Sequence, residues 1–279
     1  MRRYVRIYFK LVAQFFKRFL EYRTDFFIGI LSFVFTQAAG IIFIEVVFGS
    51  IEYLNSGGVL FEKTWLYLIY GMFQIPRGID HLFTDNLWLI SYYNRRGLLD
   101  KYLTRPINVL FHIIAERFQF EALGELIVGT AILAYVLPQL NIVFTPIVVL
   151  NLVLFIIMSA LIYTSIKLIT GSLSFWTKDS QPIMSSVYEV ATFTRQPLDI
   201  YPAPIKFILV YIIPFAFTSY YPSVYLLNQI DGVNIPMMSL FGDGVYPLLL
   251  QCFIWTILLM GISYFIWLQG LKRYESAGS

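Results

Sequence analysis

The side chains best equipped for chemistry are ionisable residues placed within or beside long apolar stretches. Arg77, Asp80 and His81 cluster near the end of one stretch, and Glu121 and Glu125 lie four residues apart in another. Ionisable groups inside a membrane are costly, so they face partners, water or a substrate. Three interpretations stay open: an ion pair of Arg77 with Glu121 or Glu125 that joins two helices, contact with a substrate, or a position outside the hydrocarbon.

Two further basic residues accompany these clusters. Arg117, Glu121 and Glu125 recur at intervals of four residues, which predicts one shared helical face. Lys167 lies 21 residues after Pro146, which is about 31 Å along a helix at 1.5 Å per residue. That length takes Lys167 to the inner interface of a membrane, where its long side chain is predicted to snorkel.

Residue patterns typical of enzymes are missing from the sequence. It has two histidines, no H-E-x-x-H pattern and no carboxylate–histidine spacing suited to a metal. It has no G-x-S-x-G elbow and no G-x-x-x-x-G-K-S/T phosphate loop, so no metal, ATP or other cofactor is expected on this chain. A membrane-embedded lipid-modifying enzyme remains an alternative, and its candidate groups are Arg77, Asp80, His81, Glu121 and Glu125.

Six apolar stretches must position these residues. Each is about 17–23 residues long, which is enough to cross a hydrocarbon core of roughly 30 Å as a helix. The hydrophobic fraction is 58%, above the roughly 45–50% of soluble domains. The predicted fold is an all-α integral membrane protein with one transmembrane domain over residues 1–279. The predicted spans are Phe26–Phe48, Trp65–Phe83, Phe118–Leu137, Pro146–Leu168, Ile205–Tyr221 and Tyr246–Trp267.

Basic residues are distributed unevenly between the two sides of these spans. With the N-terminus inside, 17 of the 20 lysines and arginines fall in inner segments, and only Lys63 lies outside. The positive-inside rule then predicts that both termini are cytoplasmic. Basic residues beside an anionic leaflet indicate membrane lipid, and not nucleic acid, as their partner. The expected location is the bacterial cytoplasmic membrane.

The segments outside the spans differ in composition. Residues 1–24 carry a polar stripe and an apolar face at helical spacing, which predicts an amphipathic entry helix lying in the interface. The inner loop at residues 84–117 is long and ionic. The outer link at residues 222–245 is apolar and contains prolines and glycines, so a re-entrant element is predicted there, between spans five and six.

Three parts of the sequence are more distinctive than generic lipid-facing sequence. They are Arg95–Asn108, then Arg195–Pro202 with Ile213–Phe217 and Ser219–Ser223, and finally Arg273–Ser279. Together they resemble the membrane subunits of type-2 ATP-binding-cassette exporters, in a branch of bacterial permeases long classed as of unknown function. Members of that branch carry G-x-L-D-x-x-L-x-R-P and P-L-x-I-Y-P, and the resemblance covers essentially the whole chain.

The resemblance implies a transport subunit and not an enzyme, with ATP and magnesium bound by separate ABC ATPase subunits. Such permeases work in pairs, identical or with a sister permease, and export cargo from the cytoplasm or inner leaflet. Because the spans are rich in aromatic residues and poor in charge, amphipathic, peptide or lipid-like cargo is expected. An ion-coupled secondary transporter is a further alternative, but its paired broken helices and inverted repeat are not found.

The resemblance implies that the segment from Gly97 to Pro106 is the element that contacts the ATPase. Gly97 is expected to allow a turn, and Leu98, Leu99 and Leu103 are expected to fill an apolar cleft. Charged side chains set the register of the contact, namely Asp100, Lys101 and Arg105. The alternative for this segment is an interfacial helix anchored by the two arginines that precede it.

An outer gate is predicted where two prolines interrupt and follow the fifth span. Aromatic side chains lie around these prolines, and proline breaks a helix. Anchoring of the tyrosines at the membrane interface is the alternative. The predicted gate residues are Pro214, Phe215, Phe217, Tyr220, Tyr221 and Pro222.

Overall fold

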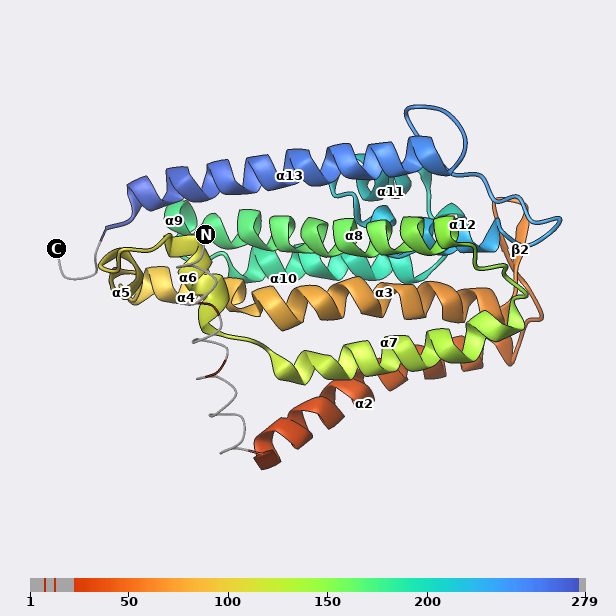
Figure 1. Ribbon diagram of the computed structural model, residues 1–279, viewed down its shortest axis with the longest axis horizontal. Helices are drawn as coiled ribbons and strands as arrows, with labels where there is room; N and C mark the ends of the chain where they lie inside the picture. Colours follow the sequence, from red (N-terminus) through yellow and green to blue (C-terminus); the bar gives the residue numbers. More distant parts are fainter. Residues whose placement is uncertain (1–7, 9–12, 14–22, 276–279) are drawn as a thin grey trace.

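The computed structural model describes Tyr8, Ala13 and residues 23–275. In this part of the chain, long helices run side by side along one axis, and the only strands form one short hairpin (Figure 1). The prediction of an all-α architecture is therefore confirmed. The predicted entry helix over residues 1–24 falls almost wholly outside the described residues, as do the last four residues of the chain.

The first two long helices are joined by the β-hairpin. Helix α2 (Arg23–Phe48) is almost entirely apolar and leads to strands β1 (Leu54–Ser56) and β2 (Val59–Phe61), which pair antiparallel. Helix α3 (Lys63–Thr84) then runs back along the bundle. We call the end of the bundle that carries the hairpin the hairpin end, and the opposite end the loop end.

Short helices between α3 and α7 build the loop end. In chain order they are η1 (Asp85–Leu89), α4 (Ile90–Arg95), α5 (Asp100–Leu103) and α6 (Val109–Glu116). The turn η2 (Phe120–Ala122) leads into α7 (Leu123–Val136), which returns to the hairpin end and finishes in η3 (Leu137–Gln139). The long inner loop of the sequence is thus a folded unit of the loop end.

Helix α8 (Pro146–Ser172) runs through the middle of the bundle to the loop end (Figure 1). Thr145 caps its first turn by accepting a hydrogen bond from the Val148 amide at 3.3 Å, and Pro146 suits the first helical position because it needs no amide partner. The short α9 (Ser174–Thr177) follows, and then the chain turns back into α10 (Gln181–Val190).

Helix α10 and its continuation η4 (Ala191–Arg195) make the fifth pass along the bundle. The residue before α10's N-cap, Asp179, accepts a hydrogen bond from Ser91 at the loop end, and Tyr188 donates to Asp80 midway. Its end, Arg195, lies over the ring of Tyr70 near the hairpin end. The spans predicted at Pro146–Leu168 and Ile205–Tyr221 left the segment between them, including Trp176–Pro204, as an inner loop, and the structure corrects this because α10 and η4 run along the bundle. Hydropathy misses this helix because one face is polar and its apolar face packs against other helices.

The predicted fifth span, Ile205–Tyr221, is instead a reversal that starts and ends at the hairpin end. Its elements are η5 (Leu198–Ile200), α11 (Ala203–Phe207), the π-helix η6 (Ile208–Ile212), η7 (Phe215–Thr218) and α12 (Tyr220–Leu227). The helix stops before Pro214, which has no amide hydrogen to continue it. Residues 228–244 form a loop without a helix. The re-entrant element was predicted at 222–245, so the prediction placed its start about 20 residues too far along the chain.

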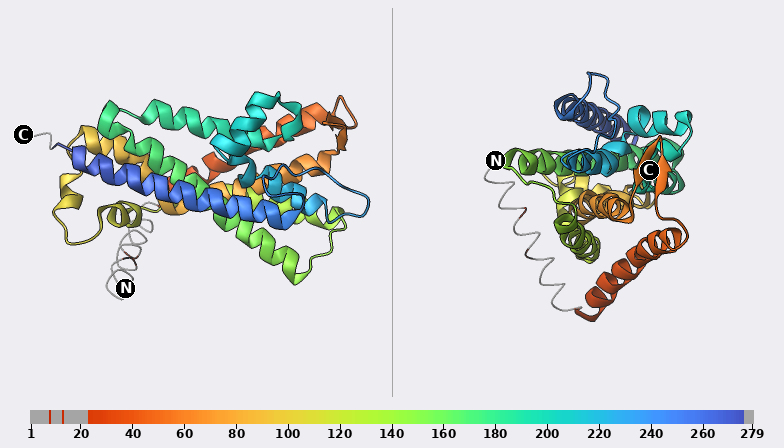
Figure 2. Two further views of the ribbon diagram at one scale, coloured as in Figure 1. Left: turned by 90° about the horizontal axis from the view of Figure 1, so that it is seen from above. Right: turned by 90° about the vertical axis from the view of Figure 1, so that its right-hand side faces the viewer.

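The last helix, α13 (Val245–Arg273), packs along α8 and returns the chain to the loop end (Figure 2). Four segments are long and apolar enough to cross a membrane, namely Phe26–Phe48, Phe120–Gln139, Pro146–Thr177 and Val245–Arg273. Helix α3 and the α10–η4 pass run the same axis with more polar composition. Arg195 and Lys206, two of the basic residues assigned to the inner side, lie toward the hairpin end, beside Tyr70 and Asp199 respectively.

Glycines allow α2 to approach the bundle closely. A Cβ at Gly29 would overlap the Glu121 side chain, and one at Gly40 would overlap the Tyr70 ring. These two glycines are eleven residues apart, which is about three helical turns, so they lie on one face of α2. The opposite face of α2 is exposed along its length.

Candidate functional site

A fully buried ion pair lies in the middle of the bundle. Lys167 Nζ on α8 is 2.7 Å from Asp80 Oδ2 on α3, and neither side chain has any exposed surface. The prediction that Lys167 snorkels to the interface was wrong, because Tyr188 of α10 covers it, with the Lys167 Nζ 5.6 Å from the ring centroid. The unpredicted pass of α10 therefore encloses the charge.

Three hydroxyl groups complete the environment of the Asp80 carboxylate. Its Oδ1 accepts hydrogen bonds from Thr84 at 2.6 Å and from Thr164 at 2.8 Å, and its Oδ2 accepts one from Tyr188 at 2.7 Å. A buried charge is tolerated when it is paired and its lone pairs are satisfied in this way. The carboxylate thereby joins three helices: α3, α8 and α10.

A second buried carboxylate, that of Glu125, lies on the neighbouring helix α7. Glu125 Oε2 is 3.0 Å from His81 Nδ1, and its Oε1 is 3.8 Å from Arg77 Nε. The structure therefore pairs Arg77 with Glu125, whereas Glu121 lies against α2. The backbone is extended at Arg117, so Arg117 does not continue the predicted face with the two glutamates.

These ionic groups contact one another inside the bundle, although Arg77 Nε has no hydrogen-bond partner. Arg77, Asp80 and Glu125 therefore act as a brace that holds α3, α7, α8 and α10 together. The lipid-modifying alternative calls for polar groups converging at a membrane surface, but Asp80 and Glu125 are buried and Glu121 lies apart on the α2 side. Sequence reasoning missed Tyr188 and Thr164, because no pattern indicated that α10 would reach α3.

The predicted ATPase-contacting segment begins with a Schellman turn. Gly97 has φ +67°, its amide donates to the Asn94 carbonyl, and the Leu98 amide donates to the Tyr93 carbonyl. That pair of hydrogen bonds and the left-handed residue define this C-terminal cap. The predicted role of Gly97 as a turn residue agrees with this geometry.

Apolar residues of this segment point in two directions. Leu99 and Tyr102 are fully buried in a small core at the loop end, whereas Leu98 and Leu103 are 39% and 44% exposed. The assignment of Leu99 to a partner cleft is therefore corrected, because its side chain fills the chain's own core. Other members of this core are Leu87, Ile90, Ile113, Leu168 and Trp267.

Charged side chains in α5 and just after it bind to side chains of α6. Lys101 Nζ is 2.9 Å from Glu116 Oε1, and Arg105 Nη1 is 3.1 Å from His112 Nε2. Burial and the neighbouring Arg105 lower the pKa of His112 below its ordinary value. Asp100 lies beside Tyr274, which packs on the same small core. Arg105 and Pro106 are exposed.

The loop end is also tied to the start of α10. Arg95 Nη1 is 2.6 Å from Asp179 Oδ2, and Asn94 Nδ2 donates to the Ser174 carbonyl at 2.8 Å. Ser91 Oγ donates to the other oxygen of Asp179 at 2.9 Å. Displacement of α4 and α5 therefore acts directly on the turn from which α10 departs.

The predicted gate residues form a buried plug near the hairpin end. All six are buried, and hydrogen bonds hold the plug to its neighbours. Ser159 donates to the Phe217 carbonyl, Ser219 donates to the Thr194 carbonyl, and Tyr221 donates to the Met238 carbonyl. Anchoring of the tyrosines at a membrane interface is thus excluded for this conformation. The gate residues are Pro214, Phe215, Phe217, Tyr220, Tyr221 and Pro222.

Helix α10 has one buried face and one exposed polar face. Met184, Tyr188, Ala191 and Thr194 recur at helical spacing and are buried. The opposite face is exposed, and it carries Gln181, Ser185, Ser186 and Glu189. A helix of this composition at membrane depth needs water or protein beside its polar face, because lipid does not solvate these groups.

These features define a helical membrane protein with an ionic brace in its interior and a folded loop at one end. The family model of the ABC-2 family transporter proteins matches residues 34–278. The chain therefore belongs to the ABC-2 transporter family and is the membrane, or permease, component of an ABC transporter. No curated protein matches the chain in sequence.

Proposed function

We propose that this permease exports amphipathic, peptide or lipid-like cargo across the bacterial cytoplasmic membrane, driven by separate ABC ATPase subunits. The observation that carries the proposal is the surface of the loop end. Leu98 and Leu103 are exposed there beside charged residues, on a segment held rigid by its own core. An exposed apolar pair within a charged rim is typical of a protein contact surface.

The loop end is proposed to face the cytoplasm, because most basic residues in the described part of the chain lie there. In this orientation six lengthwise passes cross the membrane, with α3 and α10–η4 among them, and the segment 203–227 enters and leaves from the outer side. The polar face of α10 would line the path of the cargo, opposite a second permease, identical or sister. The apolar face of α2 would meet that permease or lipid.

Motion of the ATPases would reach the membrane helices by two routes. The small loop-end core joins Leu99 to Leu168 on α8 and to Trp267 on α13. The ion pair of Arg95 with Asp179 joins the same unit to α10. Since α10 ends beside the plug at the hairpin end, closure of the ATPases at one end is expected to release the proposed gate at the other.

The test is ATP hydrolysis that purifies with the tagged permease and is inhibited by vanadate. Replacing Leu98 and Leu103 together by Asp should abolish this activity, since a carboxylate forced into an apolar cleft costs several kcal/mol, or on the order of a thousandfold in affinity. Leu60→Asp, on the exposed hairpin at the other end, is the matched control and should keep it.

Both loop substitutions lie on exposed side chains, so folding should be retained and is checked by gel filtration. The proposal fails if the wild-type permease carries no ATP hydrolysis. It also fails at this surface if the double variant keeps full activity. Cargo export is then measured as ATP-dependent uptake into inside-out vesicles.

A further inference from the structure

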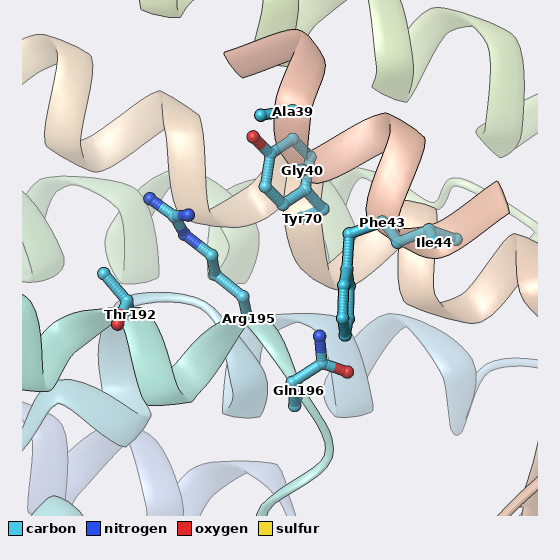
Figure 3. Close-up of a pocket in the computed structure, with 8 residues that line it drawn as sticks. All are labelled: Ala39, Gly40, Phe43, Ile44, Tyr70, Thr192, Arg195 and Gln196. Carbon is cyan, nitrogen blue, oxygen red and sulfur yellow. The ribbon is translucent and has the colours of Figure 1, made fainter. Parts of the chain in front are cut away.

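A cavity of about 330 Å³ opens between α2 and the end of the α10–η4 pass. Gly40 and Phe43 of α2 form one wall, Tyr70 of α3 another, and Thr192 and Arg195 the third. Figure 3 shows the guanidinium group of Arg195 extending between Thr192 and the ring of Tyr70. This cavity lies outside the ionic brace and outside the loop end.

The cation in this cavity lacks a counter-charge. Within the described part of the chain, no carboxylate lies within ion-pair distance of Arg195, and its buried Nε has no hydrogen-bond partner. Its guanidinium carbon lies 4.4 Å from the centroid of the Phe73 ring and 5.6 Å from that of Tyr70. Glu189, the carboxylate six residues earlier on α10, is exposed and forms no ion pair with it. Aromatic faces alone are a weak substitute for an anion.

A second guanidinium adds to the positive charge. Arg77 lies over the same Phe73 ring, with its guanidinium carbon 5.3 Å from the centroid. It shares its single carboxylate, Glu125, with His81. Lys167 and Asp80 neutralise each other. Two arginines therefore contact one aromatic ring, and Glu125, the one carboxylate paired with either of them among the described residues, contacts Arg77, so the region attracts an anion.

The α2 wall of the cavity is apolar and lies at membrane depth, whereas Thr192 and Gln196 add polar side chains beside Arg195. Tyr70 is seven residues from the start of α3, which puts the cavity about 10 Å below the hairpin end of that helix. Phe43 is more than half exposed on the open side of the cavity, and Ile44 is buried behind it. A free inorganic anion gains nothing from this apolar wall, whereas an anion that carries a hydrocarbon chain fits both parts.

We propose that the cavity binds a phosphate- or carboxylate-bearing amphiphile, with its anionic group on Arg195 and its hydrocarbon chain along α2. The inference that the bound molecule is cargo rests on the proposed export function. The inference that the cavity binds it is argued from the cavity alone. Two sources supply such a molecule: the anionic phospholipids of the bilayer and single-chain amphiphiles of the cell. The shared chemistry is an anionic group on an apolar chain.

Binding is tested on the purified full-length chain in a neutral maltoside detergent, with dodecyl phosphate as the probe in calorimetric titrations. The wild-type protein should bind it, and Arg195→Gln should weaken binding by about tenfold or more, the scale of a charged hydrogen bond. Arg195→Lys should restore part of the affinity. Lys63→Gln removes one cation at the same end, outside the cavity, and should leave affinity unchanged.

A second variant keeps the charge of Arg195 and fills the cavity. Thr192→Trp fills the cavity from η4 and should also weaken binding, while gel filtration and thermal unfolding confirm that each variant is folded. Equal affinity of wild type and Arg195→Gln overturns the proposal. Inorganic phosphate that binds as tightly as dodecyl phosphate overturns it too, because the apolar wall would then contribute nothing.

Two further measurements on the same variants distinguish a bilayer lipid from a single-chain amphiphile that is cargo. Native mass spectrometry after extraction from phosphatidylglycerol nanodiscs detects a retained bilayer lipid, which should be lost in Arg195→Gln. Stimulation of ATP hydrolysis by dodecyl phosphate in the assembled transporter identifies the amphiphile as cargo. Because the binding measurements use the permease alone, failure of the ATPase assembly leaves their outcome separate and interpretable.

Discussion

Loss of the ammonium group of Lys167 should destabilise the bundle strongly. The substitution Lys167→Met keeps an unbranched apolar side chain but removes the charge 2.7 Å from Asp80. Both side chains are fully buried, and without the ammonium the carboxylate keeps its hydroxyl donors Thr84, Thr164 and Tyr188. Breaking a buried pair costs about 3–5 kcal/mol. Because three hydroxyl donors to the Asp80 carboxylate remain, the expected loss of unfolding free energy lies near the lower end of that range, at about 3 kcal/mol.

Replacing Asp80 instead leaves the Lys167 ammonium without its carboxylate partner. Asp80→Asn leaves the Lys167 ammonium with the Thr84 hydroxyl at 3.4 Å and the ring of Tyr188. This is a poorer environment than the one left to the carboxylate, so the loss should approach about 5 kcal/mol. In the double variant neither charge remains, and its loss should fall below the sum of the single losses by about 2–3 kcal/mol.

The free energy of unfolding is measured by denaturant titration of the purified protein in neutral detergent. Lys101→Met is the matched control, because its ion pair with Glu116 is exposed and should contribute no more than about 1 kcal/mol. The reasoning is refuted if Lys167→Met is as mild as this control. Additivity of the two single losses would equally refute direct pairing.

Three further predictions concern other parts of the fold. A cysteine at Ala203 should be labelled by an impermeant thiol reagent from the same side as one at Asn55; labelling from the opposite side would restore the sequence-based fifth span. Gly29→Leu should lower the free energy of unfolding by about 1–3 kcal/mol through overpacking against Glu121 in η2, whereas Gly261→Leu, with open space around it, should not. Because the folded pKa of His112 is lowered, the unfolded loop takes up the proton first as pH falls through about 6.5. Hydrogen exchange in α6, corrected for intrinsic rates, should therefore rise between pH 7.5 and 5.5, and His112→Gln should remove this change.

Periodicity and hydropathy were sufficient for the apolar helices but not for the polar pass. Helices α2, α7, α8 and α13 are long runs of apolar residues, so their length and hydropathy predict them directly. The α10–η4 pass contains Glu189 and Arg195 within 15 residues, and its burial depends on neighbours that the sequence does not reveal. The predicted fifth span was placed on the next apolar stretch for that reason.

Site residues were predictable where the pattern was local. The Schellman turn at Gly97 follows from glycine after a helix, and pairing of Arg77 with Glu125 was one of two options that helical spacing allowed. The environment of Lys167 was not predictable, because Tyr188 comes from the misplaced pass. Leu99 and Leu98 are equally apolar, so only the packing against Leu168 and Trp267 distinguishes the core residue from the exposed one.

The composition of α10 also has a consequence for how the protein is made. On the scale of the insertion machinery, a charged residue at the centre of a segment costs about 2.5–3.5 kcal/mol, and α10 has no run of apolar residues to offset Glu189. As a membrane pass it would not partition into lipid by itself when it leaves the ribosome. Its insertion therefore depends on α3 and α8, which precede it and supply the partners of Tyr188, namely Asp80, Tyr163 and Lys167. Weakening that contact should reduce the yield of inserted protein during synthesis, in addition to the stability of the finished fold.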